Sequence, residues 1–88
     1  MKAVVIGVAN DVSMDQIMAV FPRHKLVVDQ FVARGEVIGI GPFSDRKGSL
    51  SIFRSREAAQ AFIEQDPFLS EGIIKSYEIR EWVDEMLT

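Results

Sequence analysis

The sequence has no cysteine, and His24 is the only histidine among its 88 residues. Without cysteine the chain forms no disulfide bond, builds no thiolate zinc site and carries no thiol nucleophile. A single histidine is also too few for a transition-metal site made from protein ligands alone. We therefore expect no metal, and no motif in the sequence indicates a cofactor.

An excess of basic charge is also lacking, since 10 lysines and arginines are set against 13 aspartates and glutamates. Proteins that bind nucleic acid usually present a basic face, so we expect no nucleic-acid partner. The apolar run at residues 3–8 is too short to span a membrane, and no clear signal-cleavage region follows it. The expectation is a soluble, cytoplasmic protein without membrane contact.

The length of the chain predicts one domain covering residues 1–88. A chain of this size buries only a modest core, yet 48% of its residues are hydrophobic. This surplus of apolar surface indicates that a second copy of the chain covers part of it. We therefore expect a homodimer, and the sequence leaves open whether dimers join into a larger assembly.

The first third of the chain predicts a strand followed by helical structure. Residues 3–8 form a compact run rich in valine and isoleucine, which is typical of a strand buried on both faces. Ser13 and Gln16 have the spacing of a capping box, and Gly35 is a natural residue just beyond a helix end. Pro22 lacks an N–H group, so it either divides a short helix from a longer one or kinks a single helix.

Two strands are predicted in the middle of the chain, at residues 36–43 and 49–53, with a polar loop between them. Pro42 ends the first of these strands. Gly39 and Gly41 lie two residues apart and therefore on one face, where we expect something to approach the backbone closely.

The last third of the chain predicts a helix and a fourth strand. Ser55 is a helix N-cap, and Asp66 stops this helix because Pro67 disfavours helical backbone at the residue before it. Residues 73–82 form the fourth strand, and the residues after it are expected to form a short helical tail.

The resulting order of strand, helix, strand, strand, helix, strand is the split βαβ pattern. It predicts an α+β, ferredoxin-like βαββαβ fold with a four-stranded antiparallel sheet and both helices on one face. Because the first strand is apolar at consecutive positions, the other face of the sheet also needs cover. Face-to-face packing of two sheets in a homodimer would supply it.

His24 is predicted to lie near the start of the helical segment after Pro22, on an apolar face shared with Val27, Val28 and Phe31. A neutral imidazole in such a place can act as a general base or as a hydrogen-bond acceptor. The alternative is that His24 lies at the edge of the core with one nitrogen hydrogen-bonded. Position alone favours this second interpretation.

Asp66 is predicted at the C-terminal end of a helix, where the helix dipole disfavours an acidic side chain. A residue that breaks a local rule without visible gain is a candidate for a functional role. The simpler interpretation is a turn, because the side chain of an aspartate often closes one. If Asp66 holds one nitrogen of His24, the other can accept a proton, but the spacing does not show that the two meet.

Five further residues are candidates for contacts with a small substrate: Arg23, Gly41, Pro42, Ser51 and Tyr77. Ser51 alternates with Ser49 along one strand, so both hydroxyls point to the same side. Tyr77 is either a proton donor or a core residue with its hydroxyl in water. Arg23 is either an anion-binding group or a solvated surface residue.

The ordered set of motifs resembles the YCII-related (YciI-like) domain family. The matching segments are "RHKLVVDQFVARG", "GIGPF", "GSLSIF" and "SREAAQAFIEQDPFLSEGIIKSYEIREW", which lie within residues 3–82. The resemblance implies a dimeric α+β barrel of ferredoxin-like protomers, with clefts between helices and sheet. It also implies an active site built on a histidine and an aspartate, which here are His24 and Asp66. Some relatives act in the breakdown of aromatic compounds, including dehydrochlorination.

One position departs from the family pattern. Family members often carry an arginine one helical turn before the histidine, but the residue there is Phe21, and Arg23 is directly adjacent to His24. Neighbouring residues on a helix point about 100° apart, so Arg23 is not equivalent to the family's arginine.

Two functional hypotheses follow. The first is a small-molecule enzyme in which His24 is the general base or acid and Asp66 orients it, with a lyase- or isomerase-like outcome on a small substrate such as an aromatic-derived one. The second is a non-catalytic homodimer that binds a small ligand or serves as an accessory module. A cavity open to both groups would favour the enzyme, whereas a sealed and fully bonded pair would favour a structural role.

Overall fold

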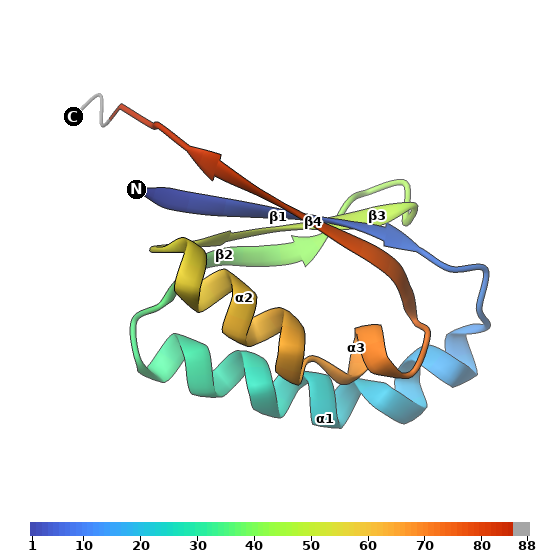
Figure 1. Cartoon of the computed structure of the whole chain (residues 1–88). Helices are drawn as coiled ribbons and strands as arrows, with labels where there is room; N and C mark the ends of the chain where they lie inside the picture. Colours follow the sequence, from blue (N-terminus) through green and yellow to red (C-terminus); the bar gives the residue numbers. More distant parts are fainter. Residues whose placement is uncertain (86–88) are drawn as a thin grey trace.

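Four antiparallel strands form one sheet, and the helices cover only one of its faces (Figure 1). The computed structural model describes residues 1–85 of the chain. The elements in chain order are β1 (Lys2–Ala9), α1 (Met14–Ala33), β2 (Val37–Pro42), β3 (Gly48–Phe53), α2 (Arg56–Gln65), α3 (Pro67–Ser70) and β4 (Ile74–Trp82). Their order across the sheet is β2-β3-β1-β4, which confirms the ferredoxin-like α+β fold.

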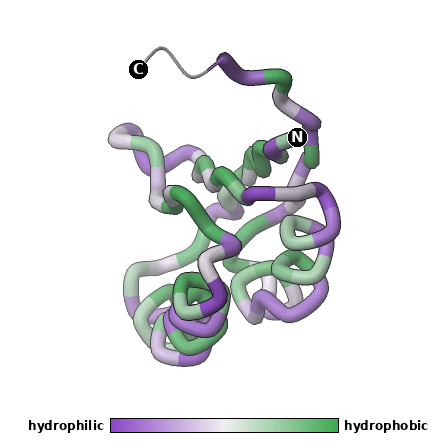
Figure 2. Tube along the Cα trace, turned by 90° about the vertical axis from the view of Figure 1, so that its left-hand side faces the viewer, coloured by the Kyte–Doolittle hydropathy of each residue, from purple (hydrophilic) through white to green (hydrophobic). Residues whose placement is uncertain are grey.

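The end of the chain differs from the expectation of a helical tail. Residues 83–85 have no helical structure, and residues 86–88 lie outside the described part of the chain. Among the helices that are described, none is long and apolar enough to cross a membrane. Figure 2 shows hydrophobic and hydrophilic residues alternating along the helices, as expected where one side of a helix packs on a sheet.

α1 is a single helix that continues through Pro22, so the proline does not divide two helices. The capping box at its start is present, with Gln16 N–H donating to the Ser13 hydroxyl at 3.1 Å. At its end Gly35 adopts a φ of +70°, as a residue just beyond a helix end often does. His24 is therefore in the middle of a long helix and not near a helix start.

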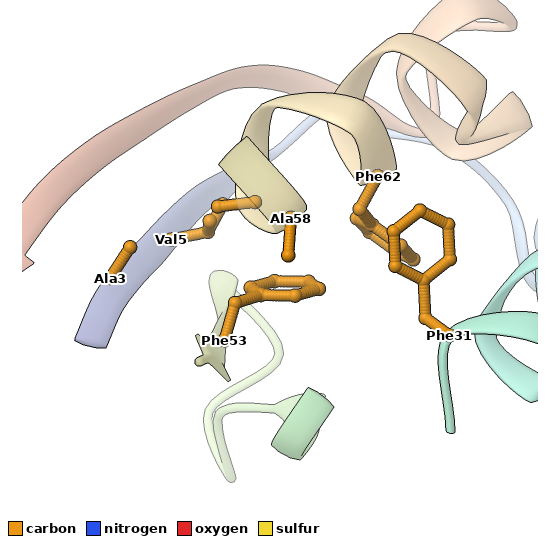
Figure 3. Close-up of a cluster of buried hydrophobic side chains, with 7 residues drawn as sticks. Ala3, Val5, Phe31, Phe53, Ala58 and Phe62 are labelled. Carbon is orange, nitrogen blue, oxygen red and sulfur yellow. The ribbon is translucent and has the colours of Figure 1, made fainter. Parts of the chain in front are cut away.

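A cluster of aromatic and small side chains forms the core between the sheet and the helices (Figure 3). Phe31 of α1 meets Phe62 of α2 edge-to-face, with ring centroids 5.5 Å apart, and Phe53 of β3 lies 5.2 Å from Phe62. Ala3 and Val5 of β1 fill the sheet side of the cluster. These contacts fix α1 and α2 to the central strands β1 and β3 of the sheet.

Within this single chain the helices bury one face of β1, and the expected cover of its other face by a second copy stays a prediction. Ala3 and Val5 are fully buried under the helices, whereas Val8 on the other face is 47% exposed in the single chain. At Gly39 and Gly41, no atom of the chain lies within 4 Å of the point where a Cβ would be, so nothing approaches them closely in this protomer. We call the helix-free side of the sheet the open face.

Asp66 lies between the helices α2 and α3, and α3 was not expected from the sequence. Its backbone is extended, with φ −75° and ψ 114°, so α2 ends there as the following Pro67 predicts. The chain then starts the four-residue helix α3, whose first residue is Pro67. This junction turns the Asp66 side chain toward the interior, where it is 1% exposed.

Replacing Ser55 by alanine removes the hydroxyl that accepts the Ala58 N–H at 3.1 Å and caps α2. We expect the free energy of unfolding to fall by about 1 kcal/mol, the usual effect of losing an N-cap. Ser55→Asp keeps an acceptor and should change stability little. Urea unfolding followed by circular dichroism measures both variants, and equal losses would contradict the capping role.

Candidate active site

The side chains of His24 and Asp66 meet, although 42 residues separate them in the sequence. Nδ1 of His24 lies 2.7 Å from Oδ1 of Asp66. The imidazole comes from the middle of α1, and the carboxylate comes from the α2–α3 junction. The side chain of Asp66 is fully buried, whereas that of His24 keeps 13% of its surface exposed.

Three hydrogen bonds hold the carboxylate of Asp66. Oδ1 accepts from the Phe68 N–H at 3.0 Å as well as from His24, and Oδ2 accepts from the Tyr77 hydroxyl at 2.6 Å. An ionised carboxylate accepts hydrogen bonds on both oxygens, so this set of donors suits it. In the neutral imidazole, Nδ1 of His24 then carries the hydrogen of the shared bond, and Nε2 keeps its lone pair.

Nε2 of His24 has no hydrogen-bond partner in the described part of the chain. Every fully buried side-chain nitrogen or oxygen among these residues does have a partner. The unpaired Nε2 must therefore be one of the exposed atoms of the ring. His24 thus offers a proton-accepting nitrogen outward while Asp66 holds the other nitrogen inside.

Tyr77 supports Asp66 from the sheet. Burial raises the pKa of the Tyr77 hydroxyl, and its hydrogen bond to Asp66 and the negative charge of that carboxylate raise it further. The hydroxyl therefore stays protonated, and its hydrogen is directed at Asp66. Of the two interpretations of Tyr77, the structure places it as a partly buried residue whose proton is committed within the protein.

Aromatic rings fix the plane of the imidazole. The ring of Phe68 stacks on His24 with centroids 3.8 Å apart and an interplanar angle of 5°. Phe62 meets the imidazole edge-on at 6.2 Å, and Phe21 lies at 6.0 Å. Phe68 was not among the residues expected at the site, although an aromatic residue two positions after Asp66 is visible in "DPF".

A cavity of about 600 Å³ lies against His24, between the helices and the sheet. Its apolar lining consists of Val12, Met14, Ile17, Phe21, Ile40, Pro42, Phe68, Ile73 and Ile74, among others. Gly41, Pro42, Ser51 and Tyr77, which are expected substrate contacts, all line it as well. Asp66 does not line the cavity, so it is placed to act on a ligand only through His24.

Arg23 is not brought to this cavity. Its exposed guanidinium donates a hydrogen bond to the carboxylate of Glu71, and this pairing raises the pKa of Arg23 and lowers that of Glu71. Arg23 is thus an exposed, paired residue outside the lining of this cavity. The basic side chain that does line the cavity is Arg46, from the β2–β3 loop, together with the acidic Asp11.

Gly7 of β1 has a role that was not expected from the sequence. A Cβ at this position would lie 2.5 Å from Oγ of Ser49 and 2.8 Å from Cε1 of Tyr77. Only glycine leaves room for both side chains on the face that lines the cavity. An isolated glycine inside a strand pattern is the signal for such a close approach, but here it lies within a continuous apolar run.

The described residues contain no cluster of potential metal ligands. No group of three or more histidine, cysteine, aspartate or glutamate side chains gathers there at a spacing that could hold an ion.

An imidazole backed by a buried carboxylate therefore lies at the wall of a largely apolar cavity, on a domain with the ferredoxin-like fold. The sequence profile of the YCII-related domain matches residues 1–83, so the chain belongs to the YCII-related domain family. No curated protein matches the sequence at a significant level.

Among solved structures, the fold is similar to that of 5-chloro-2-hydroxyhydroquinone dehydrochlorinase from Burkholderia phenoliruptrix, in complex with 2,5-dihydroxybenzoquinone. The TM-score is 0.73, and the match covers 93% of each chain. The sequences are 19% identical, so this likeness establishes the fold that the two chains share.

Tyr77 is the only tyrosine of the chain, so tyrosinate absorbance reports on the site alone. We expect the folded protein to develop none as the pH passes about 10, the ordinary tyrosine pKa. The folded state then keeps a proton that the unfolded chain releases. The contribution of Tyr77 to the free energy of unfolding is therefore fully present below that pH, and it is lost as the pH rises above it.

Asp66→Asn is the matched variant for this titration. It removes the negative charge but leaves Tyr77 buried, so tyrosinate should form at a lower pH than in the wild type. An ultraviolet absorbance titration, with circular dichroism to follow folding, measures both proteins. Wild-type tyrosinate appearing at the ordinary pH while the fold is intact would refute the bond to Asp66.

Proposed function

We propose that this protein is a small-molecule enzyme that transfers a proton with His24. The observation that carries the proposal is that the two nitrogens of the imidazole have different surroundings. Nδ1 is held by the buried Asp66 at 2.7 Å, while the unpaired Nε2 is exposed beside the cavity. A general base needs this combination of fixed orientation and a free lone pair.

The proposed step begins when Nε2 takes a proton from a substrate atom in the cavity. The imidazolium that forms is stabilised by the negative charge of Asp66, which already accepts the Nδ1 hydrogen. In an elimination a leaving group departs with its electron pair and the proton passes to solvent. In an isomerisation the same proton returns to a different atom of the substrate.

The apolar lining supports a substrate with a small hydrophobic body, and the stacked His24 and Phe68 rings suit a planar one. The structurally similar dehydrochlorinase acts on a chlorinated hydroxyquinol ring. We extend this substrate class to the present chain as part of the proposal. Loss of HCl from such a ring needs a base for the proton and no external oxidant.

His24→Ala removes the proposed base, and chloride release from 5-chloro-2-hydroxyhydroquinone is the assay. We expect the rate to fall by about 10²- to 10⁴-fold, the usual contribution of general-base catalysis. Lys25→Ala is the control, because this exposed neighbour on α1 pairs only with Asp29 among the described residues. Equal turnover by wild type and His24→Ala would rule out the mechanism.

The second candidate function is binding of a small ligand without catalysis. The complete hydrogen bonding of Asp66 and the close stacking of Phe68 on His24 favour it, because both would also serve a purely structural pair. Wild-type protein that binds the chlorinated ring in the cavity but releases no chloride would support this candidate over the enzyme.

We also propose that the protein forms a homodimer through the open face of the sheet. Its apolar side chains are Val4, Ile6 and Val8 of β1, Ile38 of β2, and Leu50 and Ile52 of β3. Glu78 and Arg80 of β4 lie on the same face, opposite Ile6 and Val4, and can pair across a two-fold axis. Packing of two such faces would bury the apolar surface that one chain leaves exposed.

Ile6→Glu places a charge at the centre of the open face, where burial without a partner is unfavourable. We expect size-exclusion chromatography with light scattering to give the dimer mass for the wild type and the monomer mass for this variant. Gln60→Glu, on the exposed side of α2, should leave the dimer intact. A monomeric wild-type protein would refute the proposed assembly.

A further inference from the structure

The floor of the cavity carries two serine hydroxyls without partners among the described residues, and we propose that Ser49 and Ser51 bind an uncharged oxygen substituent of the ligand. Both residues belong to β3, two positions apart, so both point to the helix-covered face of the sheet. Both line the cavity together with His24. The inference deepens the proposed function, because it takes this cavity as the ligand site.

Ser51 is 3% exposed, yet its hydroxyl makes no hydrogen bond within the described residues. Fully buried side-chain oxygens and nitrogens in this part of the chain all have partners. The Ser51 oxygen is therefore among the few atoms of the residue that remain accessible, and it faces the cavity that the residue lines. A nearly buried hydroxyl kept open to a cavity is available to a ligand.

Ser49 lies closer to the hydrogen-bond network of Asp66. Its hydroxyl oxygen is 2.5 Å from the point where a Cβ of Gly7 would be, and Cε1 of Tyr77 is 2.8 Å from the same point. The hydroxyl thus approaches the Tyr77 ring above Gly7, and the Tyr77 hydroxyl in turn supports Asp66. The glycine keeps the Ser49 hydroxyl at the level of the cavity floor.

The charges around the cavity indicate that the bound oxygen is neutral. The two charged residues of the lining, Arg46 and Asp11, are of opposite sign and are both exposed to solvent. Among the described residues that line the cavity, the one lysine or arginine side chain is thus the solvent-exposed Arg46 of the β2–β3 loop. A hydroxyl both donates and accepts, so serine hydroxyls suit a phenolic hydroxyl or a carbonyl equally well.

The apolar lining makes this recognition selective. A ligand that fills the cavity with carbon alone would strip water from both hydroxyls without replacing their hydrogen bonds, which is unfavourable. The favoured ligand class is therefore a small apolar ring with at least one oxygen substituent. One oxygen is bound by the serines, and another part of the ring is presented to His24.

Phenol and toluene are the probes, because they differ by one hydroxyl replaced by a methyl group and toluene has no oxygen for the serines to bind. Backbone-amide NMR titrations give the dissociation constants for the wild type, Ser51→Ala and Ser49→Ala. We expect the wild type to prefer phenol by about two- to tenfold, the range for one net hydrogen bond. The preference should fall toward one in each serine variant. Ser76→Ala, on the open face, should keep it.

An unchanged preference in both variants would overturn the proposal, as would a wild type that binds neither probe at millimolar concentration or binds both equally. Loss of preference in Ser76→Ala as well would show a general effect and also refute it. The readout is binding, so it does not depend on turnover. A protein that shows the preference but no chloride release would contradict the catalytic proposal and leave the serine subsite standing.

Discussion

The buried carboxylate of Asp66 is the constraint on which the site depends. A charge removed from water without partners costs several kcal/mol, so the fold must supply donors wherever this side chain is placed. They come from His24 on α1, from the backbone of α3 and from Tyr77 on β4, while the Asp66 backbone itself ends α2. Four elements therefore reach their final positions together, and the imidazole gains its orientation from the same contacts that dock the helices on the sheet.

The features that sequence alone could predict are those decided within a few residues. The Ser13 capping box, the Gly35 helix end and the break at Asp66–Pro67 each follow from local backbone chemistry, and together they give the order of elements and the fold. The meeting of His24 with Asp66 spans 42 residues and depends on how α1 packs against α3. Spacing could pose that contact as a hypothesis, and the resemblance to a family supported it, but only the packed structure brings the two together.

The differences from expectation also have physical reasons. Pro22 is on the exposed side of α1, where water can satisfy the carbonyl that loses its partner, so the helix continues. Arg23 is one position from His24, and the turn of the helix directs it to Glu71 instead of the cavity. α3 has only four residues, too few to show a helical period. The role of Gly7 is not visible in the sequence, because the Tyr77 ring that requires a glycine there comes from a distant strand.

The residues that take part in the hydrogen bonds to Asp66 tolerate substitution less well than the residues that only line the cavity. Change at Asp66, His24 or Tyr77 alone leaves a buried acceptor or donor unmatched, so such changes are coupled and accumulate only in compensating sets. Residues such as Ile17 and Ile40 line the cavity through packing only and can exchange for other apolar side chains one at a time. Divergence in this architecture should thus reshape the cavity wall around an unchanging network of His24, Asp66 and Tyr77. The shape of the cavity can therefore change by single substitutions while the hydrogen bonds of Asp66 are retained.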